Sequence, residues 1–180
     1  ITRIDKMGDM ILTLPVIKSL KEYNNSNQIH VISSINNLKI CNNFKYINKI
    51  FSLNKSLYGF LNIVKEIREE KYEHYFNFSP NWQGILLGIF SKSKKKSILI
   101  LKSRYKSKIF SKFFQQIIGK IFYDNIYIVD RHISLRLKKN IHQTHLMFSL
   151  LKKSGYSLNK NINIDYFFPL SDKIKFEKKI

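Results

Sequence analysis

Short apolar runs alternate along the chain with longer segments in which apolar residues recur every three or four positions. The short runs are rich in β-branched residues and are flanked by polar turns, so they predict strands. These strands are expected at Ile1–Ile4, Gln28–Ser34, Ile47–Leu53, Glu73–Phe78, Ser97–Leu101 and Ile126–Val129. The longer segments predict helices at Thr13–Tyr23, Asn37–Cys41, Leu57–Lys71, Trp82–Phe90, Ser107–Phe122 and His142–Ser154.

Apolar positions within three of these helices mark the sides that we expect to be buried. They are Val16, Ile17, Leu20 and Tyr23, then Leu57, Phe60, Leu61, Val64 and Ile67, and then Leu146, Leu150 and Leu151. Gly155 is expected to end the last helix, because glycine readily adopts the left-handed backbone that closes many helices. Strands separated by helices indicate right-handed βαβ units. The sequence therefore predicts an α/β fold, a Rossmann-like parallel sheet with helices on both faces.

Two junctions between a strand and the following helix carry polar residues that suit a binding site. The first is Asp5–Thr13, and the second follows the fourth predicted strand. Ligands of parallel sheets bind beyond the carboxyl ends of the strands, and both junctions open on that edge. At the second junction, Ser79, Asn81 and Gln83 offer hydrogen bonds to a polar ligand. The alternative is that this junction only starts a helix, with Trp82 packed beneath it.

A proline constrains where the first helix begins. If Asp9 started one straight helix, Pro15 would fall in its second turn, where proline removes a hydrogen bond. With Thr13 as the N-cap, Pro15 falls in the first turn, where it is tolerated. We therefore expect Gly8–Leu12 to form a tight turn or a distorted first turn, in which Gly8 permits a positive φ or the close approach of a ligand. Asp9 would then project at the carboxyl edge of the sheet, as a functional carboxylate or as a plain capping residue.

The formal net charge of this 180-residue chain is +20, which favours an anionic partner such as nucleic acid, anionic lipid or a phosphorylated substrate. The alternative is a bias of composition, because lysine far outnumbers arginine. Lys92 and Lys94–Lys96 are candidates for contacts with an anionic partner. The alternative is that they form a solvated connection ahead of a strand. Basic and aromatic residues are interleaved in the stretch Ser103–Lys120. Three structures are compatible with this composition: an amphipathic helix on a membrane surface, a segment that covers a binding site, or a core helix. A basic nucleic-acid- or membrane-surface-binding module without catalysis is therefore one hypothesis.

The sequence lacks the patterns of several other classes of site. It contains neither G-x-G-x-x-G nor G-x-x-x-x-G-K-[ST], so no glycine-rich loop for phosphate is expected. A single cysteine, Cys41, excludes an internal disulfide, and no apolar run is long enough to predict a transmembrane span. His142 and His145 share a helix face. No Glu or Cys stands beside them and H-E-x-x-H is absent, so zinc is not expected.

The opening stretch of the chain, Arg3-Ile-Asp-Lys-Met-Gly8-Asp9-Met-Ile-Leu-Thr13-Leu-Pro15, resembles the start of the heptosyltransferase group, glycosyltransferase family nine. Members typically begin with a strand, followed by R-x-(two or three residues)-G-D-(three apolar or small residues)-T-x-P and a helix. A looser similarity continues over nearly the whole chain. Some members carry Ser-Ser before the glycine, where this chain has Asp5 and Lys6.

This resemblance implies a GT-B architecture, in which two Rossmann-like domains face a cleft. The N-terminal domain holds the acceptor, here a lipopolysaccharide-core type, and the C-terminal domain holds the nucleotide-sugar, often ADP-heptose. The implied reaction inverts the anomeric centre and needs no metal ion or other cofactor. The general base of the family is the aspartate of the Gly-Asp pair, which corresponds to Asp9.

On this interpretation, residues 1–165 form the acceptor domain and residues 166–180 begin the interdomain linker, with the nucleotide-sugar domain outside the sequence. Substrate contacts are expected from Arg3, Lys6, Gly8, Thr13, Ser79 and Asn81, and Lys6 is the best candidate for an acceptor phosphate. We expect a cytoplasmic enzyme, at the inner membrane or free of it, that binds no nucleic acid. The chain starts without methionine and ends as a helix begins, so we expect a fragment that does not turn over by itself.

Overall fold

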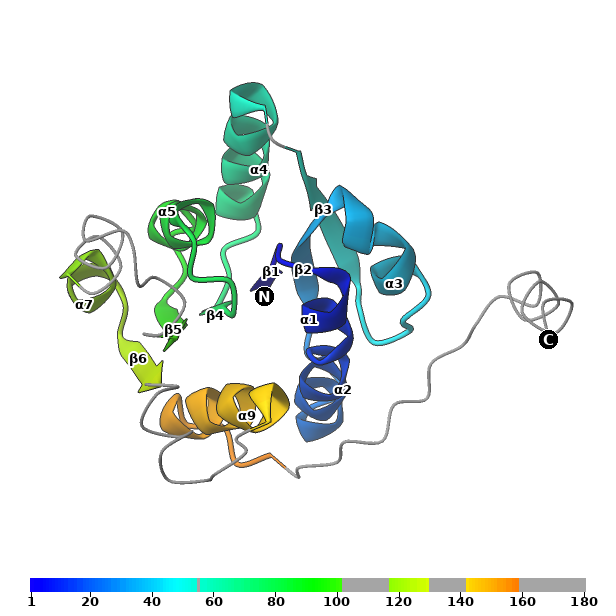
Figure 1. The fold of residues 1–180 in the computed structure, drawn as a ribbon, viewed down its shortest axis with the longest axis vertical. Coiled ribbons are helices and arrows are strands. Elements are labelled where there is room, and N and C mark those ends of the chain that lie inside the picture. The colour runs from blue at the N-terminus through cyan, green and yellow to red at the C-terminus, as the bar shows by residue number, and fades with distance from the viewer. Residues whose placement is uncertain (55, 102–116, 130–141, 159–180) are drawn as a thin grey trace, which may run out of the picture.

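The structure, a computed structural model, describes residues 1–54, 56–101, 117–129 and 142–158. Within these residues six parallel strands form one sheet in the order β3-β2-β1-β4-β5-β6 (Figure 1). They are β1 Thr2–Arg3, β2 His30–Ser34, β3 Lys49–Leu53, β4 His74–Asn77, β5 Lys95–Leu101 and β6 Asn125–Val129. Each strand overlaps a predicted one, although β5 begins two residues earlier and includes Lys95 and Lys96, so the predicted Rossmann-like parallel sheet is confirmed.

Helices cover both faces of this sheet (Figure 1). The helices α2 Leu14–Tyr23 and α9 Gln143–Lys153 lie on one face, and α4 Leu57–Glu69 and α5 Trp82–Phe90 lie on the other. The remaining helical segments with described bounds are short: α1 Met7–Ile11, η1 Ile35–Asn37, α3 Leu38–Asn42 and α7 Gly119–Phe122. None of the helices in the described ranges is long and apolar enough to cross a membrane.

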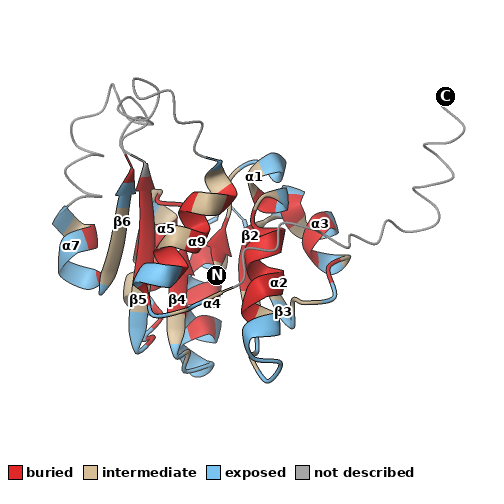
Figure 2. Ribbon diagram, turned by 90° about the horizontal axis from the view of Figure 1, so that it is seen from below, coloured by how far each residue is buried: buried red, intermediate tan, exposed pale blue. Residues whose placement is uncertain are grey.

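The strands supply two apolar layers, one on each face of the sheet. Val31 and Leu99 pack in the layer beneath α2 and α9, whereas Ile32, Ile98 and Ile100 pack in the layer beneath α4 and α5. This alternation is the period of two that a strand imposes on its side chains. Burial is concentrated in the strands and in the helix faces that meet them (Figure 2). Burial on both faces explains why the strands read as nearly continuous apolar runs.

The buried side of α4 differs from the predicted one. Leu57 and Leu61, which the periodicity assigns to the core, are 72% and 55% exposed. The stripe that reaches the sheet consists of Phe60, Ile63, Val64 and Ile67. Leu57 lies in the first turn ahead of this stripe, and Leu61 lies beside it. Tyr23, at the last residue of α2, is likewise half exposed, contrary to the prediction.

The end of α9 confirms the predicted role of Gly155. Its backbone has a φ of +94°, the left-handed conformation that glycine adopts without strain. The N–H of Tyr156 donates to the carbonyl of Leu151 at 3.0 Å, and the N–H of Gly155 donates to that of Lys152 at 3.1 Å. This pair of bonds is the Schellman motif, and it satisfies carbonyls that the helix leaves unpaired.

Some predicted segments lie outside the described residues. They include most of the predicted helix Ser107–Phe122, of which α7 is the described part, and most of the basic and aromatic stretch Ser103–Lys120. They also include the predicted linker at residues 166–180.

Candidate active site

The order of the strands reverses between β1 and β4, which are neighbours in the sheet although β2 and β3 lie between them in sequence. Such a reversal is the point where open parallel sheets bind ligands, beyond the carboxyl ends of the strands. Here β1 ends at Arg3 and β4 ends at Asn77. The two predicted junctions therefore meet at this point, and Ser79 of the second junction donates a hydrogen bond to Asp5 of the first, at 2.8 Å between Oγ and Oδ2.

The segment after β1 is more regular than predicted. Of the two predicted alternatives for Gly8–Leu12, the tight turn is not found: residues Met7–Ile11 form the short helix α1, with Asp9 in its first turn, and a break separates it from α2. Gly8 does not take a positive φ, which among the described glycines only Gly155 has. A Cβ atom placed on Gly8 would meet no atom within 4 Å, so the backbone here is open to a ligand.

Thr13 separates α1 from α2, as predicted, but its side chain does not cap the second helix. Regular helix resumes at Leu14, which places Pro15 in the first turn. The backbone of Thr13 is itself helical, with φ −89° and ψ −22°, so its hydroxyl faces the preceding turn. There it donates to the carbonyl oxygen of Asp9 at 2.8 Å. Thr13 therefore links the two short helices and holds the backbone of Asp9.

The carboxylate of Asp9 faces the guanidinium of Arg3. The distance from the second terminal nitrogen of Arg3 to Oδ1 of Asp9 is 3.3 Å, and Nε of Arg3 donates to the carbonyl oxygen of Asp9 at 3.2 Å. The same guanidinium donates to the carbonyl oxygen of Phe78, the residue that follows β4. Arg3 is fully buried, whereas 15% of the Asp9 side chain is exposed. A rigid, always charged fork at the end of β1 thus orients a carboxylate that solvent can reach.

A second carboxylate shares this guanidinium. Oδ2 of Asp5 lies 3.6 Å from the first terminal nitrogen of Arg3, and the Asp5 side chain is 16% exposed. The hydroxyl of Ser79 donates to Asp5 and accepts the N–H of Ile4 at 2.9 Å. Asp5 therefore ties the β1 junction to the β4 junction. Two carboxylates and one guanidinium give this centre a formal charge of −1 at neutral pH.

Gln143 is a residue of this centre that the sequence did not single out. It is the first residue of α9, which the chain reaches about 140 residues after β1. With the amide oriented so that its nitrogen faces Asp9, Gln143 donates to Oδ1 of Asp9 at 3.0 Å and accepts from Arg3. The side-chain amide of Gln143 thus forms hydrogen bonds with both Arg3 and Asp9. No local signal singled it out, because α9 carries several other polar residues.

The predicted substrate-binding residues fall into three groups. Arg3, Thr13 and Ser79 are buried, and their side chains bond to other protein groups. Lys6 and Gly8 are exposed beside Asp9. Asn81 caps α5, since its side-chain oxygen accepts the N–H of Gly84 at 2.8 Å. Direct contact of any of these six residues with a substrate stays a prediction.

The second junction starts a helix, as its alternative interpretation requires, but Trp82 does not lie beneath that helix. Its side chain is 55% exposed, and its ring meets that of Phe60 with centroids 6.0 Å apart. The aromatic ring of Trp82 therefore belongs to the outer surface of α4 and α5.

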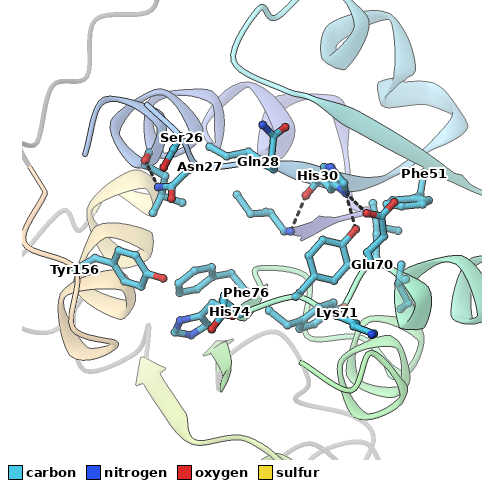
Figure 3. A pocket seen from close by; sticks show the side chains of 18 residues that line it. Ser26, Asn27, Gln28, His30, Phe51, Glu70, Lys71, His74, Phe76 and Tyr156 are labelled. Atoms are coloured by element: carbon cyan, nitrogen blue, oxygen red, sulfur yellow. Dashed lines mark hydrogen bonds and ion pairs between the residues drawn. The ribbon is translucent and has the colours of Figure 1, made fainter. Parts of the chain in front are cut away.

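A cavity of about 600 Å³ lies at the opposite, amino edge of the sheet (Figure 3). Its lining includes His30 and His74, the first residues of β2 and β4, and Tyr156. Burial lowers the pKa of His74 to about 4 and also lowers the pKa of His30. Neither Arg3 nor Asp9 lines this cavity, so it is separate from the candidate active site.

Within the part of the chain that the structure describes, no three His, Cys, Asp or Glu side chains converge on a point where a metal ion could bind. His142 and His145 lie near each other, with ring centroids 6.0 Å apart, and they form no such group. The expectation of a reaction without a metal stays a prediction.

No protein-family model matches this sequence, and no curated protein matches it. Among solved structures, the chain is similar to the crystal structure of the glycosyl transferase family 9 protein from Veillonella parvula DSM 2008, with a TM-score of 0.72 and 14% sequence identity. The similarity covers 98% of this chain and 47% of that chain, so this chain spans about half of the other's length. The chain therefore shares the α/β fold of a family 9 glycosyltransferase structure.

Proposed function

We propose that this chain is the acceptor-binding half of an inverting glycosyltransferase, with Asp9 as the general base. The observation that carries the proposal is the carboxylate of Asp9, held by Arg3 and Gln143 at the switch point of the sheet and still reached by solvent. The fold shared with a family 9 glycosyl transferase structure supports it. The Gly8-Asp9 and Thr13-x-Pro15 pattern of the sequence supports it as well.

The proposed reaction is one displacement at the anomeric carbon of the donor sugar. Asp9 accepts the proton of the acceptor hydroxyl while that oxygen forms a bond to the anomeric carbon. The bond from this carbon to the nucleotide phosphate breaks on the opposite face, and the nucleotide leaves with the electron pair. The anomeric configuration is inverted, and no metal ion takes part. Arg3 stays buried throughout and keeps the carboxylate of Asp9 aligned with the hydroxyl.

The proposed donor is ADP-heptose, and the proposed acceptor is a lipopolysaccharide-core glycolipid that carries phosphates. The exposed Lys6, three residues before Asp9, is the proposed contact for an acceptor phosphate. Such an acceptor would bring the enzyme to the cytoplasmic face of the inner membrane. We do not expect the enzyme to bind nucleic acid.

The proposed division of the protein follows from the shared fold. Residues 1–165 form the acceptor domain, residues 166–180 start the linker, and a second Rossmann-like domain outside these 180 residues binds the nucleotide-sugar. The 47% coverage of the neighbouring structure supports this division. Because the donor site lies in the second domain, the 180-residue chain alone should not turn over.

The test is a transfer assay with the full-length enzyme, ADP-heptose and a lipopolysaccharide-core acceptor. The expected result is release of ADP with one heptose added to the acceptor, at a rate that EDTA does not lower. The 180-residue chain assayed alone serves as the control and should give no product. If neither ADP-heptose nor any other nucleotide-sugar in a panel is consumed, the proposed function is wrong.

A further inference from the structure

The outer surface of α4 and α5 carries a group of exposed apolar side chains, which we name the α4–α5 patch. Its members are Leu57, Tyr58, Leu61 and Trp82, each more than half exposed. Three of them lie in the first two turns of α4, and Trp82 is the first residue of α5. The two helices contact each other, and Trp82 meets α4 through the ring of Phe60. The patch therefore spans the first turns of two helices that pack against each other.

A basic groove adjoins this patch along the same face of α4. The groove has a volume of about 390 Å³, and its lining includes Leu61, which is also a member of the patch. Three cationic side chains line it, Lys65, Arg68 and Lys92, against one carboxylate, Glu69. Among the described residues, none of the three cations forms an ion pair with a carboxylate.

We propose that the α4–α5 patch and its basic groove form a surface that docks on an anionic lipid bilayer. The apolar side chains would enter the interface, and Lys65, Arg68 and Lys92 would contact phosphate groups of the lipids. This inference rests on the proposed function, since a glycolipid acceptor is presented at such a surface.

The chemistry of the surface favours a bilayer over a protein partner. Tyrosine and tryptophan prefer the boundary between hydrocarbon and water, because one end of each side chain is apolar and the other can hydrogen bond. Lysine is depleted in protein interfaces, whereas it lies beside the apolar residues here, in a chain with a formal charge of +20. Charge complementarity therefore identifies the partner as an anionic membrane surface.

The location of the patch also suits the candidate active site. Helices α4 and α5 both begin at the carboxyl edge of the sheet, where β3 and β4 end. Trp82 follows Ser79 by three residues, and Ser79 bonds to Asp5 beside Arg3. Docking through the first turns of these helices would therefore bring the edge that carries Asp9 close to the lipid head groups.

Trp82 allows a direct test, because it is the only tryptophan among the 180 residues. The protein is mixed with vesicles of phosphatidylcholine alone or with added phosphatidylglycerol, without donor or acceptor. With the anionic vesicles we expect Trp82 emission to shift to the blue, and lipids brominated on their acyl chains to quench it. Binding to anionic vesicles without a shift or quenching of Trp82 would overturn the proposal, as would absence of binding.

Charge-reversal variants separate this surface from the general charge of the protein. The double variant Lys65→Glu with Arg68→Glu should weaken binding to anionic vesicles by about tenfold or more. The control, Lys45→Glu with Lys152→Glu, makes the same change of net charge at exposed positions on α9 and before β3, and should change binding less than about twofold. Equal losses in both variants would show that overall charge drives binding, and the proposal would be wrong.

Thermal unfolding followed by circular dichroism should give each variant a melting temperature near that of the parent, since the four side chains are exposed. The vesicle experiment contains no nucleotide-sugar, so its failure would leave the proposed transfer reaction untouched. Conversely, vesicle binding through Trp82 combined with no transfer from any donor would reject the reaction and retain the docking surface.

Discussion

At the scale of single residues, the candidate site depends on one buried guanidinium. Arg3 is fully enclosed, so its charge is tolerated only because carboxylates and carbonyl oxygens surround it. The charge in turn fixes Asp9, which would otherwise be a mobile side chain on the short helix α1. The sequence resemblance predicts that Arg3 contacts the substrate. In the folded chain it contacts Asp9, so we propose that it positions this carboxylate.

Gln143 is predicted to position Asp9 in the same way. Substitution Gln143→Leu in the full-length enzyme removes the bonds to Asp9 and Arg3 but leaves the ion pair. We expect kcat to fall by about tenfold while KM for the acceptor is unchanged, because alignment of the base is lost and binding is not. Steady-state kinetics of the variant measure this, and Gln28→Leu, an exposed glutamine before β2, is the matched control. An unchanged kcat for Gln143→Leu would reject the positioning role.

At the scale of elements, substitutions of Gly88 in α5 and Gly8 in α1 test how closely each helix is packed by its neighbours. A Cβ atom on Gly88 would collide with the hydroxyl of Tyr123 and lie 2.7 Å from Cε1 of Tyr75. Tyr123 donates to the carbonyl oxygens of Gly84 and Ile85, at 3.3 and 3.2 Å, so it cannot move without losing these bonds.

Gly88→Ala should therefore lower the free energy of unfolding by about 1–3 kcal/mol, the usual cost of overpacking. Gly8→Ala is the matched control, because a Cβ there meets nothing within 4 Å and alanine favours the helix. Urea unfolding of both variants measures the difference. Equal stability of the two variants would contradict the packing that we describe beneath α5.

The pattern of the sequence predicts the strands and the long helices well, and it predicts the site in part. Strands buried on both faces leave short apolar runs, and Pro15 marks the start of α2 correctly. The regular helix α1 was not predicted because Pro15 rules out one straight helix from Asp9, and the break at Thr13 that allows two successive helices leaves no clear mark in the sequence. Gln143 escaped it because only the folded chain brings α9 against β1. Long-range contacts of this kind leave no signal in a local window of sequence.

At the scale of the whole molecule, the stability should depend on pH through the cavity at the amino edge. His74 hydrogen bonds to Ser97, with Nε2 and Oγ 2.7 Å apart, and stacks on Phe76 with centroids 4.0 Å apart. Burial, and then the charge of Lys95, lower the pKa of His74 to about 4, whereas an unfolded histidine titrates near 6.5.

Between these two values the unfolded chain binds a proton that the folded chain does not. The contribution of His74 to the free energy of unfolding is therefore fully present above about pH 6.5 and declines as the pH falls toward 4. Urea unfolding at about pH 7 and pH 5 should show this decline, and His74→Gln should reduce it. His142→Gln, an exposed histidine outside the cavity, should leave the decline unchanged. A decline of equal size in His74→Gln and the parent would contradict this origin.

The molecule as a whole is organised around its carboxyl edge. The sheet order places Arg3, Asp5, Asp9 and Ser79 at the switch point, and the α4–α5 patch begins at the same edge. The chain spans about half of a solved family 9 glycosyl transferase, 47% of its length. A second domain that supplies the nucleotide-sugar would complete the site from the side of this edge.

The most direct measurement of the central claim compares two carboxylates that share one guanidinium. Asp9→Asn and Asp5→Asn are each introduced into the full-length enzyme, and transfer is assayed after circular dichroism confirms that both variants fold. Both side chains are similarly exposed, at 15% and 16%, so the substitutions differ mainly in position. We predict that Asp9→Asn lowers kcat by a factor of about 10² to 10⁴, while Asp5→Asn lowers it by less than about tenfold. Normal turnover by Asp9→Asn would contradict the assignment of Asp9 as the general base.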